Sequence, residues 1–331
     1  METNSLVDLP ILVTGAGGFI GSRLTEALCV RGARVRAFVR YNSRADAGLL
    51  KALPPDVLRS VEVIMGDLRD EDALEKAASG TALVFHLGAL ISIPYSYQHP
   101  VEVVQTNILG TLAVLQACRK SGSRLVHTST SEVYGTAQRV PIDEQHPLQG
   151  QSPYSASKIG ADKLVESYYR AFGVPAVTIR PFNTYGPGQS ARAVIPTIIT
   201  QALQAEEIHL GNLEARRDFT FLDDTVAAFV KAAETSGIEG ETFNLGSGSE
   251  VSIRELTEEI LALTGSQARV VVDEERLRPV KSEVLRLLAD NSKAQRVLGW
   301  SPQVSLREGL TQTIAWVRAH MDFYRPGRYE R

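Results

Sequence analysis

A glycine-rich turn between an apolar run and a helical pattern constrains this chain more than any other stretch. Residues 10–14 (Pro-Ile-Leu-Val-Thr) are typical of a strand buried in a parallel sheet. Gly15, Gly18 and Gly21 follow in the spacing G-x-x-G-x-x-G, and an amphipathic pattern continues to about Arg31. Such glycines allow a tight turn, a close backbone approach to a pyrophosphate and close packing of helix on strand. The stretch predicts an α/β fold whose first helix presents its N-terminus to phosphates.

The rest of the first half alternates apolar runs with helical patterns, whereas the second half is richer in Gly, Pro and short elements. Further strands are predicted over residues 34–39, 61–65, 82–86, 124–128, 176–180 and 241–244. Helices are predicted over residues 99–121, 153–171, 193–205, 223–233 and 306–320, and from about residue 252. We therefore predict a doubly wound parallel sheet of Rossmann type in residues 1–180. A smaller C-terminal α/β substrate lobe takes mainly residues 181–331, and the chain re-enters the sheet within that range.

Length and composition indicate a cytoplasmic protein with a large core. The chain has 331 residues, 44% of them hydrophobic, which is enough for a large core. A net charge of −3 gives no reason to expect nucleic acid or an anionic membrane as partner. Cys29 and Cys118 lie in apolar helical patterns and are interpreted as packed thiols in a reducing compartment. We find no basic run ahead of an apolar stretch at the N-terminus, and no segment that approaches the roughly 18 apolar residues of a membrane span.

The start of the predicted helix 153–171 carries a general base. Tyr154 and Lys158 are four residues apart, so they share one helix face one turn apart. A lysine ammonium beside a phenol favours the phenolate, so we expect Lys158 to lower the pKa of Tyr154 towards neutrality. Tyr154 then acts as a general base next to a redox cofactor held by the glycine turn.

Polar residues follow the predicted strand 124–128, at the edge of the sheet where ligands bind in open α/β folds. They are Thr130, Ser131 and Glu132. For Thr130 and Ser131 a plain capping turn is the alternative. A carboxylate at this edge beside a dinucleotide site is more readily explained by function.

The end of the second strand leaves the cofactor open between NAD and NADP. An NAD site usually has an acidic residue about 20 positions after the glycines. Here residues 40–44 read Arg-Tyr-Asn-Ser-Arg, with no acid. Arg40, Ser43 and Arg44 can hold a 2′-phosphate, and the alternative is that Arg40 stacks over the adenine.

Two further strand ends face the same site. Asp67 is expected either to accept from the adenine amino group or to cap a helix that begins near Glu71. The small residues of the segment Leu87-Gly88-Ala89 let a cofactor lie against the backbone. His86, just before them, is interpreted as a packed strand-end residue.

At this point the chain resembles the extended short-chain dehydrogenase/reductase family over nearly its full length. The motifs that carry the resemblance are TGAGGFIG (14–21), GDL (66–68), HLGA (86–89), YSASK (154–158), RPFNTYGP (180–187) and RDFTFLDD (217–224). The resemblance implies a tightly bound NAD or NADP, a nucleotide-sugar substrate in the lobe, no metal, and a homodimer through helices 99–121 and 153–171. It also implies the cofactor contacts, which are Gly15, Gly17, Gly18, Phe19, Ile20, Gly21, Arg40, Asn42, Ser43, Arg44, Asp67, Leu68, Leu87, Gly88, Ala89, Asn107, Thr128, Tyr154, Lys158 and Pro181.

Within the family, HTSTSEVYG (127–135) resembles the sugar-nucleotide 4,6-dehydratases more than the 4-epimerases, which usually lack the carboxylate at position 132. The stretches 142–164, 182–203 and 276–284 resemble the branch that acts on nucleotide-activated N-acetylglucosamine in legionaminic acid and related pathways. UDP-sugar is the first expectation and GDP-sugar the second. One departure is that dehydratases of dTDP-glucose usually carry Thr-Asp-Glu. This chain has Thr-Ser-Glu, as GDP-mannose dehydratases do and as UDP-glucuronate decarboxylases can.

The resemblance implies a mechanism and a set of substrate contacts. Tyr154 takes the 4-hydroxyl proton, Thr130 hydrogen-bonds that oxygen, and Glu132 removes the C5 proton, with Glu132 or Ser131 protonating the departing water. The expected substrate contacts are Thr130, Asn183, Arg192, Arg217 and Arg278, of which Arg192 has a plain surface residue as its alternative. A 4-epimerase and a UDP-glucuronate decarboxylase remain as alternative enzymes, and a non-catalytic cofactor sensor as an alternative of another class.

Overall fold

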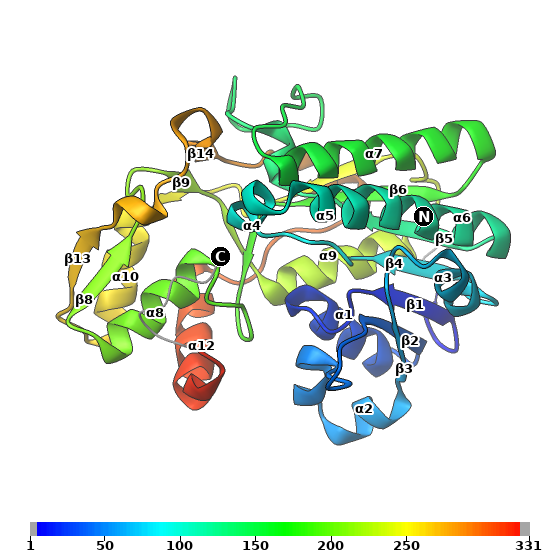
Figure 1. Ribbon diagram of the computed structural model, residues 1–331, viewed down its shortest axis with the longest axis horizontal. Coiled ribbons are helices and arrows are strands. Elements are labelled where there is room, and N and C mark those ends of the chain that lie inside the picture. Colours follow the sequence, from blue (N-terminus) through cyan, green and yellow to red (C-terminus); the bar gives the residue numbers. More distant parts are fainter. Residues whose placement is uncertain (1–4, 325–331) are drawn as a thin grey trace.

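A seven-stranded parallel sheet forms the larger part of the molecule (Figure 1), seen here in a computed structural model that describes residues 5–324. Its strands are β1 (Pro10–Thr14), β2 (Arg34–Arg40), β3 (Glu62–Gly66), β4 (Leu83–His86), β5 (Arg124–Thr128), β6 (Ala176–Pro181) and β11 (Thr242–Leu245). They lie in the order β11-β6-β5-β4-β1-β2-β3. The order reverses between β1 and β4, so a ligand crevice is expected at their carboxyl ends. The predicted strands and the doubly wound Rossmann fold are confirmed, with each strand end within one residue of its prediction.

Helices cover both faces of this sheet. One face carries α3 (Glu71–Ala78), α6 (Gly110–Ser121) and α7 (Pro153–Phe172), whose apolar side chains form one core with Leu12 and Leu125 of the sheet. The other face carries α1 (Phe19–Val30), α9 (Leu222–Glu234) and α11 (Ser292–Leu298), together with the shorter η1 (Gly48–Ala52) and α2 (Pro55–Ser60). Because β11 pairs with β6 and α9 packs on α1, these later elements belong to the sheet's core although they follow residue 181.

The smaller lobe lies beside the carboxyl ends of the strands (Figure 1). Its helices are α8 (Val194–Gln204), α10 (Ile253–Thr264) and α12 (Leu306–Ala319). Its short strands are β7 (Asn183–Tyr185), β8 (Glu207–Leu210), β9 (Arg216–Arg217), β10 (Phe219–Phe221), β12 (Val251–Ser252), β13 (Arg269–Val272) and β14 (Arg286–Leu287). A separate core, with Ile198, Leu256 and Leu310 at its centre, holds the lobe together. The division at residue 180 remains an interpretation.

The helical stretch Pro100–Ser121 corrects one expectation. It consists of α5 (Pro100–Val104), a π-helical segment (Gln105–Leu109) and α6, and it follows the short helix α4 (Ile93–Gln98). By length and mean hydropathy this stretch is apolar enough to cross a membrane, so the expectation that no segment approaches a membrane span was wrong. Half of it is buried, and it packs against α3 and α7, because its apolar side chains belong to a core helix of the sheet.

Both cysteines are free, Cys118 buried and Cys29 partly buried, which confirms their interpretation as packed thiols.

Candidate active site

The glycine turn is built for a close approach of backbones. Gly15 has a φ of +71°, and a Cβ on Gly21 would lie 2.2 Å from the carbonyl oxygen of Gly15, so neither position admits a side chain. Helix α1 follows with Gly18 as its N-cap and with no side chain capping it. The first-turn N–H groups of Phe19 and Ile20 therefore have no capping side chain as acceptor. This arrangement fits the pyrophosphate of a dinucleotide.

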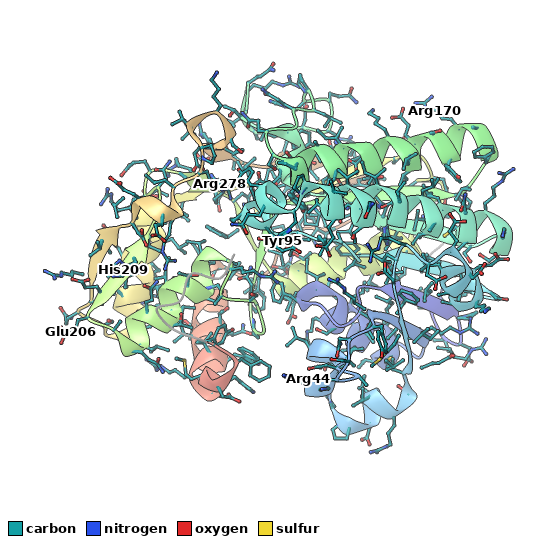
Figure 2. All side chains as sticks on the ribbon, in the orientation of Figure 1. Arg44, Tyr95, Arg170, Glu206, His209 and Arg278 are labelled. Carbon is teal, nitrogen blue, oxygen red and sulfur yellow. The ribbon has the colours of Figure 1, made fainter. Side chains whose placement is uncertain are left out.

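The loop after β2 is shaped by Asn42. Its side-chain oxygen accepts from the backbone N–H groups of Arg44 and Asp46 at 3.1 and 3.0 Å, so Asn42 holds the loop. Arg40 is exposed and its guanidinium lies 3.3 Å from Glu102. Ser43 and Arg44 are exposed, and Figure 2 shows Arg44 below α1. No carboxylate follows β2 directly, so the choice between NAD and NADP stays open.

Asp67 does not cap a helix. Asp70 is the N-cap of α3 and accepts from the backbone N–H of Ala73 at 3.0 Å, so the capping alternative for Asp67 was wrong. Asp67 instead accepts from the backbone N–H and the guanidinium of Arg69. These bonds lower the pKa of Asp67 to about 2. Arg69 is therefore a cation at this edge that the sequence analysis missed. Leu68, between them, packs on Gly88 in the loop after β4.

Buried polar side chains hold the end of β4 and the loop that follows it. His86 lies between the hydroxyl groups of Thr14 (2.7 Å) and Thr111 (3.0 Å), and burial lowers its pKa well below the usual value. This confirms His86 as a packed residue. The side chain of Asn107 bonds both the N–H and the carbonyl of Leu90, and its contact with the cofactor stays a prediction. Asn107 thereby fixes the loop that begins with Leu87, Gly88 and Ala89.

Helix α7 begins with a strong N-terminal signal that orients the Tyr154 and Lys158 face. Ser152 and Ser155 form a reciprocal capping box, and Pro153 occupies the first helical position. Tyr154 and Lys158 are both buried, at 7% and 3% exposure. The Lys158 ammonium donates to the carbonyl oxygen of Thr128 at 2.7 Å, at the end of β5.

Electrostatics around Tyr154 differ from the prediction. Burial raises the pKa of the Tyr154 phenol, a hydrogen bond with Thr130 opposes this, and the charges of Glu132 and Asp162 add to it. Lys158 does not oppose this rise, because its amine has already lost its charge at the high pH where the phenol titrates. Burial lowers the pKa of Lys158 itself to about 8. The expectation that Lys158 lowers the pKa of Tyr154 towards neutrality is therefore contradicted for the chain without bound cofactor.

The polar residues after β5 form a short turn beside Tyr154. Thr130 is the N-cap of a 3-10 helix (Ser131–Tyr134), and its hydroxyl accepts from the N–H of Glu132 at 3.2 Å. Thr130 thus caps the turn and bonds Tyr154 at once. Ser131 is buried, and the Glu132 side chain is 15% exposed. The turn brings a hydroxyl and a carboxylate to the same phenol.

Two arginines of the lobe approach Glu132. Arg278 places Nη1 3.8 Å from Oε1 of Glu132, and this buried nitrogen has no hydrogen-bond partner among the described residues. Figure 2 shows Arg278 between the lobe and the sheet. Arg217 is almost fully buried, donates to the carbonyl of Arg216 at 2.9 Å and lies 3.6 Å from Glu283. Burial lowers the pKa of Arg217, and Glu132 acts in the opposite direction. Guanidinium groups with unused donors suit a diphosphate.

The remaining predicted substrate contacts, Asn183 and Arg192, have hydrogen-bond partners within the chain. Asn183, at the start of β7, donates from its backbone and its side chain to the carbonyl of Asp218, both at 3.1 Å. It therefore joins β7 to the segment of β10. Arg192 is exposed and donates to the Ser190 hydroxyl at 3.3 Å, which agrees with the surface alternative. Pro181, which was predicted as a cofactor contact, is buried at the end of β6.

A buried ionic network beneath the site was missed. Asp162 accepts from Ser129 (2.8 Å) and from the Nη2 of Arg180 (2.9 Å), and it lies 3.2 Å from His127. The signal was present in the sequence, because Asp162 follows Lys158 by the same four residues that separate Lys158 from Tyr154.

The sequence also did not predict the contact between the lobe loop that contains Ser282 and the start of α7. The hydroxyl of Ser282 donates to the carbonyl of Gln151 at 2.6 Å and lies 2.5 Å from the hydroxyl of Tyr97. No local pattern predicts contacts between residues more than 130 positions apart. Beside this contact, an open cavity of about 870 Å³ has Gln149, Leu213 and Arg278 among its lining residues. Over residues 5–324, no three His, Cys, Asp or Glu side chains gather as a metal site would require.

Comparison with known proteins agrees with this geometry. The profile of a family described as GDP-mannose 4,6 dehydratase matches residues 12–313. A UDP-glucose 4-epimerase of Mycolicibacterium smegmatis is 35% identical over 315 residues, covering 93% of this chain and 98% of the relative. A UDP-N-acetyl-alpha-D-glucosaminuronate decarboxylase of Bacillus cytotoxicus is 31% identical over 321 residues, covering 93% and 97%.

Among solved structures, a dTDP-glucose 4,6-dehydratase of Streptomyces venezuelae with NAD bound superposes with a TM-score of 0.85. It is 30% identical, and the match covers 96% of this chain and 99% of that one. The similar proteins thus share one fold and act as dehydratase, epimerase or decarboxylase. The chain belongs to the GDP-mannose 4,6-dehydratase family of extended short-chain dehydrogenases/reductases.

Proposed function

We propose that the protein is a cytoplasmic nucleotide-sugar 4,6-dehydratase that uses NAD or NADP and converts UDP-N-acetylglucosamine, or a GDP-activated equivalent, to a 4-keto-6-deoxy sugar. The observation that carries the proposal is the carboxylate of Glu132. It follows Thr130 by two residues, and its charge acts on the phenol of Tyr154. A second acid–base group at the redox centre is what an elimination needs and what a plain 4-epimerisation does not.

The residues around the crevice fit the cofactor. The glycine turn and the uncapped start of α1 are suited to the pyrophosphate, and Arg40, Ser43, Arg44 and Arg69, near the ends of β2 and β3, would hold the adenosine end. When bound, NAD or NADP accepts a hydride from C4 of the sugar and returns it to C6, so that no net oxidation results.

Each step in the sugar has a residue in place. Tyr154 takes the proton of the 4-hydroxyl, and Thr130 stabilises the same oxygen as negative charge develops on it. The resulting 4-keto group acidifies the C5 proton, which Glu132 removes. Water leaves from C6 with the proton that Glu132 took from C5, passed on directly or through Ser131. When the hydride returns to C6, C5 takes back a proton, which is the one that Tyr154 removed from the 4-hydroxyl. Thr130 and Glu132 lie in one short turn, which fixes the positions of their side chains relative to each other.

The lobe supplies the charge for the substrate's diphosphate. Arg217 and Arg278 face carboxylates at 3.6 and 3.8 Å, beyond hydrogen-bond distance, so both retain donors for phosphate oxygens. Asn183 is placed between β7 and β10 near the same edge, with its side-chain N–H already used. Arg192 is a weaker candidate, because it is exposed.

Product analysis separates the alternatives. Purified protein given UDP-N-acetylglucosamine is expected to form a 4-keto-6-deoxy product, identified by mass and NMR, with no net change in cofactor absorbance. Formation of UDP-N-acetylgalactosamine instead favours a 4-epimerase. Release of carbon dioxide from UDP-glucuronate favours a decarboxylase; the relative described as a UDP-N-acetyl-alpha-D-glucosaminuronate decarboxylase is 31% identical to this chain, against 35% for the epimerase. Failure to transform any of a panel of nucleotide sugars favours a cofactor sensor.

Glu132→Gln tests the proposed base directly. The amide keeps the shape of the side chain but removes its basicity, so dehydration is expected to fall by about 10²–10⁴-fold. Binding of the cofactor should be unchanged, because Glu132 is not part of the glycine turn. Glu144→Gln is the matched control, since Glu144 is a partly buried carboxylate that accepts from the backbone of Asn244. Unchanged dehydration by the Glu132 variant would exclude Glu132 as the base.

We also propose a homodimer through the helices of residues 99–121 and 153–171. Their outer faces carry exposed apolar side chains, which include Val101 (66% exposed), Leu109 (50%) and Tyr169 (38%). A monomer rarely leaves such side chains on neighbouring helices uncovered. Light scattering of the purified protein is expected to give the mass of two chains, and Leu109→Glu should give that of one.

A further inference from the structure

We propose that Asp162 is a positioning residue that holds the end of β5 in place and keeps the Lys158 side chain in its charged form. The inference deepens the proposed function, because it concerns the Tyr154 and Lys158 pair on which that function depends. Asp162 follows Lys158 by four residues on α7, so it lies on the same face one turn further from the reaction centre.

Asp162 is fastened to two strands. It accepts from the Ser129 hydroxyl at 2.8 Å, immediately after β5. It accepts from Nε and Nη2 of Arg180 on β6 at 3.1 and 2.9 Å. Both Asp162 and Arg180 are buried, with side chains only 5% and 8% exposed. A buried carboxylate with charged and neutral donors is held rigidly, because each lost bond would leave an uncompensated group.

Ser129 links this carboxylate to the reaction centre. It stands between Thr128, whose carbonyl accepts from the Lys158 ammonium at 2.7 Å, and Thr130, which bonds Tyr154. A bond from Asp162 to Ser129 therefore fixes both of these neighbours at once. The hydroxyl of Thr128 has no hydrogen-bond partner among the described residues, so the chain at this point is held by the Ser129 bond and the strand pairing.

The charges around Lys158 come from several elements. On α7 itself they are Tyr154 and Asp162. The strands bring His86 on β4, His127 on β5 and Arg180 on β6, and the turn after β5 brings Glu132. The helices α4 and α5 add Tyr95, Tyr97 and Glu102. Tyr95 donates to Glu102, which also pairs with Arg40, and Tyr97 bonds Ser282.

Asp162 is the anion that acts on Lys158. Burial favours the neutral amine and lowers the pKa of Lys158 to about 8, and the charge of Asp162 opposes this. Burial alone would raise the pKa of Asp162, but the bond with His127 and the charges of Arg180 and Lys158 lower it to about 2, so Asp162 stays ionised throughout the working range. His127 carries no compensating charge, because burial lowers its pKa to about 4.

The test is a direct titration of Lys158 in the cofactor-loaded enzyme. Protein labelled with ¹³C at lysine Cε gives one NMR signal per lysine, and Lys158→Met assigns the Lys158 signal by its loss. In Asp162→Asn the midpoint of the Lys158 titration is expected to fall by about one unit or more. The alkaline limb of the pH profile of turnover should move by the same amount. Asp162→Glu keeps the charge and should restore both midpoints.

Two further variants separate charge from structure. Ser129→Ala removes a bond to Asp162 but leaves its charge, so turnover should fall about tenfold while the Lys158 midpoint stays in place. If Asp162→Asn alone does not fold, Asp162→Asn/Arg180→Met removes both buried charges together and predicts a smaller downward shift, because loss of the Arg180 cation acts in the opposite direction. An unchanged midpoint in a folded protein without the Asp162 charge overturns the proposal. The NMR titration needs no substrate, so a wrong substrate assignment leaves this result intact.

Discussion

The two sides of the active site are built in opposite ways. On the sheet side, Lys158, Asp162 and Asn107 are buried, and each is hydrogen-bonded to another part of the same domain. On the lobe side, Arg217 and Arg278 meet carboxylates only at 3.6 and 3.8 Å, and one buried nitrogen of Arg278 has no hydrogen-bond partner within residues 5–324. Under the proposed function, the chemistry falls to the side that is preorganised, and recognition of the substrate falls to the side that keeps free donors.

The difference follows from the elements that carry each side. Tyr154 and Lys158 lie on a 20-residue helix with a capping box, packed on the sheet. Arg278 lies between two short 3-10 helices, Glu274–Arg276 and Val280–Ser282, and the loop is docked through Ser282. Rigid elements place reacting groups, whereas loops are free to vary with the ligand. Variants on the sheet side should therefore lower kcat, and variants on the lobe side should raise KM.

Tyr154→Phe is expected to have the largest effect. It removes the phenolic oxygen and keeps the ring, so kcat should fall by about 10²–10⁴-fold while KM changes little. Cofactor binding, followed by fluorescence, should be retained. Tyr169→Phe is the control, because Tyr169 lies on the same helix with 38% of its surface exposed. Full turnover by Tyr154→Phe would exclude Tyr154 as the base. It would also contradict the claim that the sheet side of the site performs the chemistry.

The sequence predicted the sheet side better than the lobe side, for a physical reason. Strands such as β1 and the glycine turn have local patterns, and the four-residue spacing of Tyr154 and Lys158 needs only a helix to be meaningful. Asp162 extends that spacing, but its partner Arg180 is known only once β5 and β6 are paired. The approach of Arg278 to Glu132 joins residues about 150 positions apart, and β9 and β14, each of two residues, carry no periodicity.

The electrostatics were the least predictable part. A lysine near a tyrosine suggests attraction, yet the direction of the Lys158 ammonium depends on the Thr128 carbonyl, which belongs to another element. Burial, which dominates the pKa of Tyr154, is a property of the whole fold. The spacing of residues along one helix predicts neither the direction of the Lys158 ammonium nor the burial of Tyr154.

Arg278→Gln is expected to have the next largest effect, and on KM instead of kcat. Loss of one guanidinium facing the diphosphate should raise KM by about 10–100-fold, the value of a charge-assisted hydrogen bond. Arg192→Gln is the matched control and should change KM less than about twofold, because Arg192 is exposed and contacts only Ser190 in the described part of the chain. A pure loss of kcat in Arg278→Gln would place Arg278 on the chemical side of the site.

Acid stability gives the smallest effect and tests the sheet side without any ligand. Burial lowers the pKa of His127 from 6.5 to about 4, so between these values the unfolded chain binds a proton that the folded chain does not. The free energy of unfolding should therefore fall as the pH falls through this window, by up to about 1.4 kcal/mol per pH unit for each such histidine. His86 shifts in the same direction.

Urea unfolding at pH 7 and pH 5 measures this slope. His127→Gln keeps a donor towards Asp162 but has no titrating group, so the variant should lose about 1–2 kcal/mol less than the native protein between the two pH values. His209→Gln on the lobe is the control, because the His209 side chain is 41% exposed beside Glu207 and its replacement should leave the slope unchanged. If the slope instead disappears in the lobe variant and persists in His127→Gln, the buried ionic layer beneath the sheet edge is not what sets the acid sensitivity. The acid sensitivity would then lie on the lobe side, since any group whose pKa differs between the folded and the unfolded chain makes stability depend on pH.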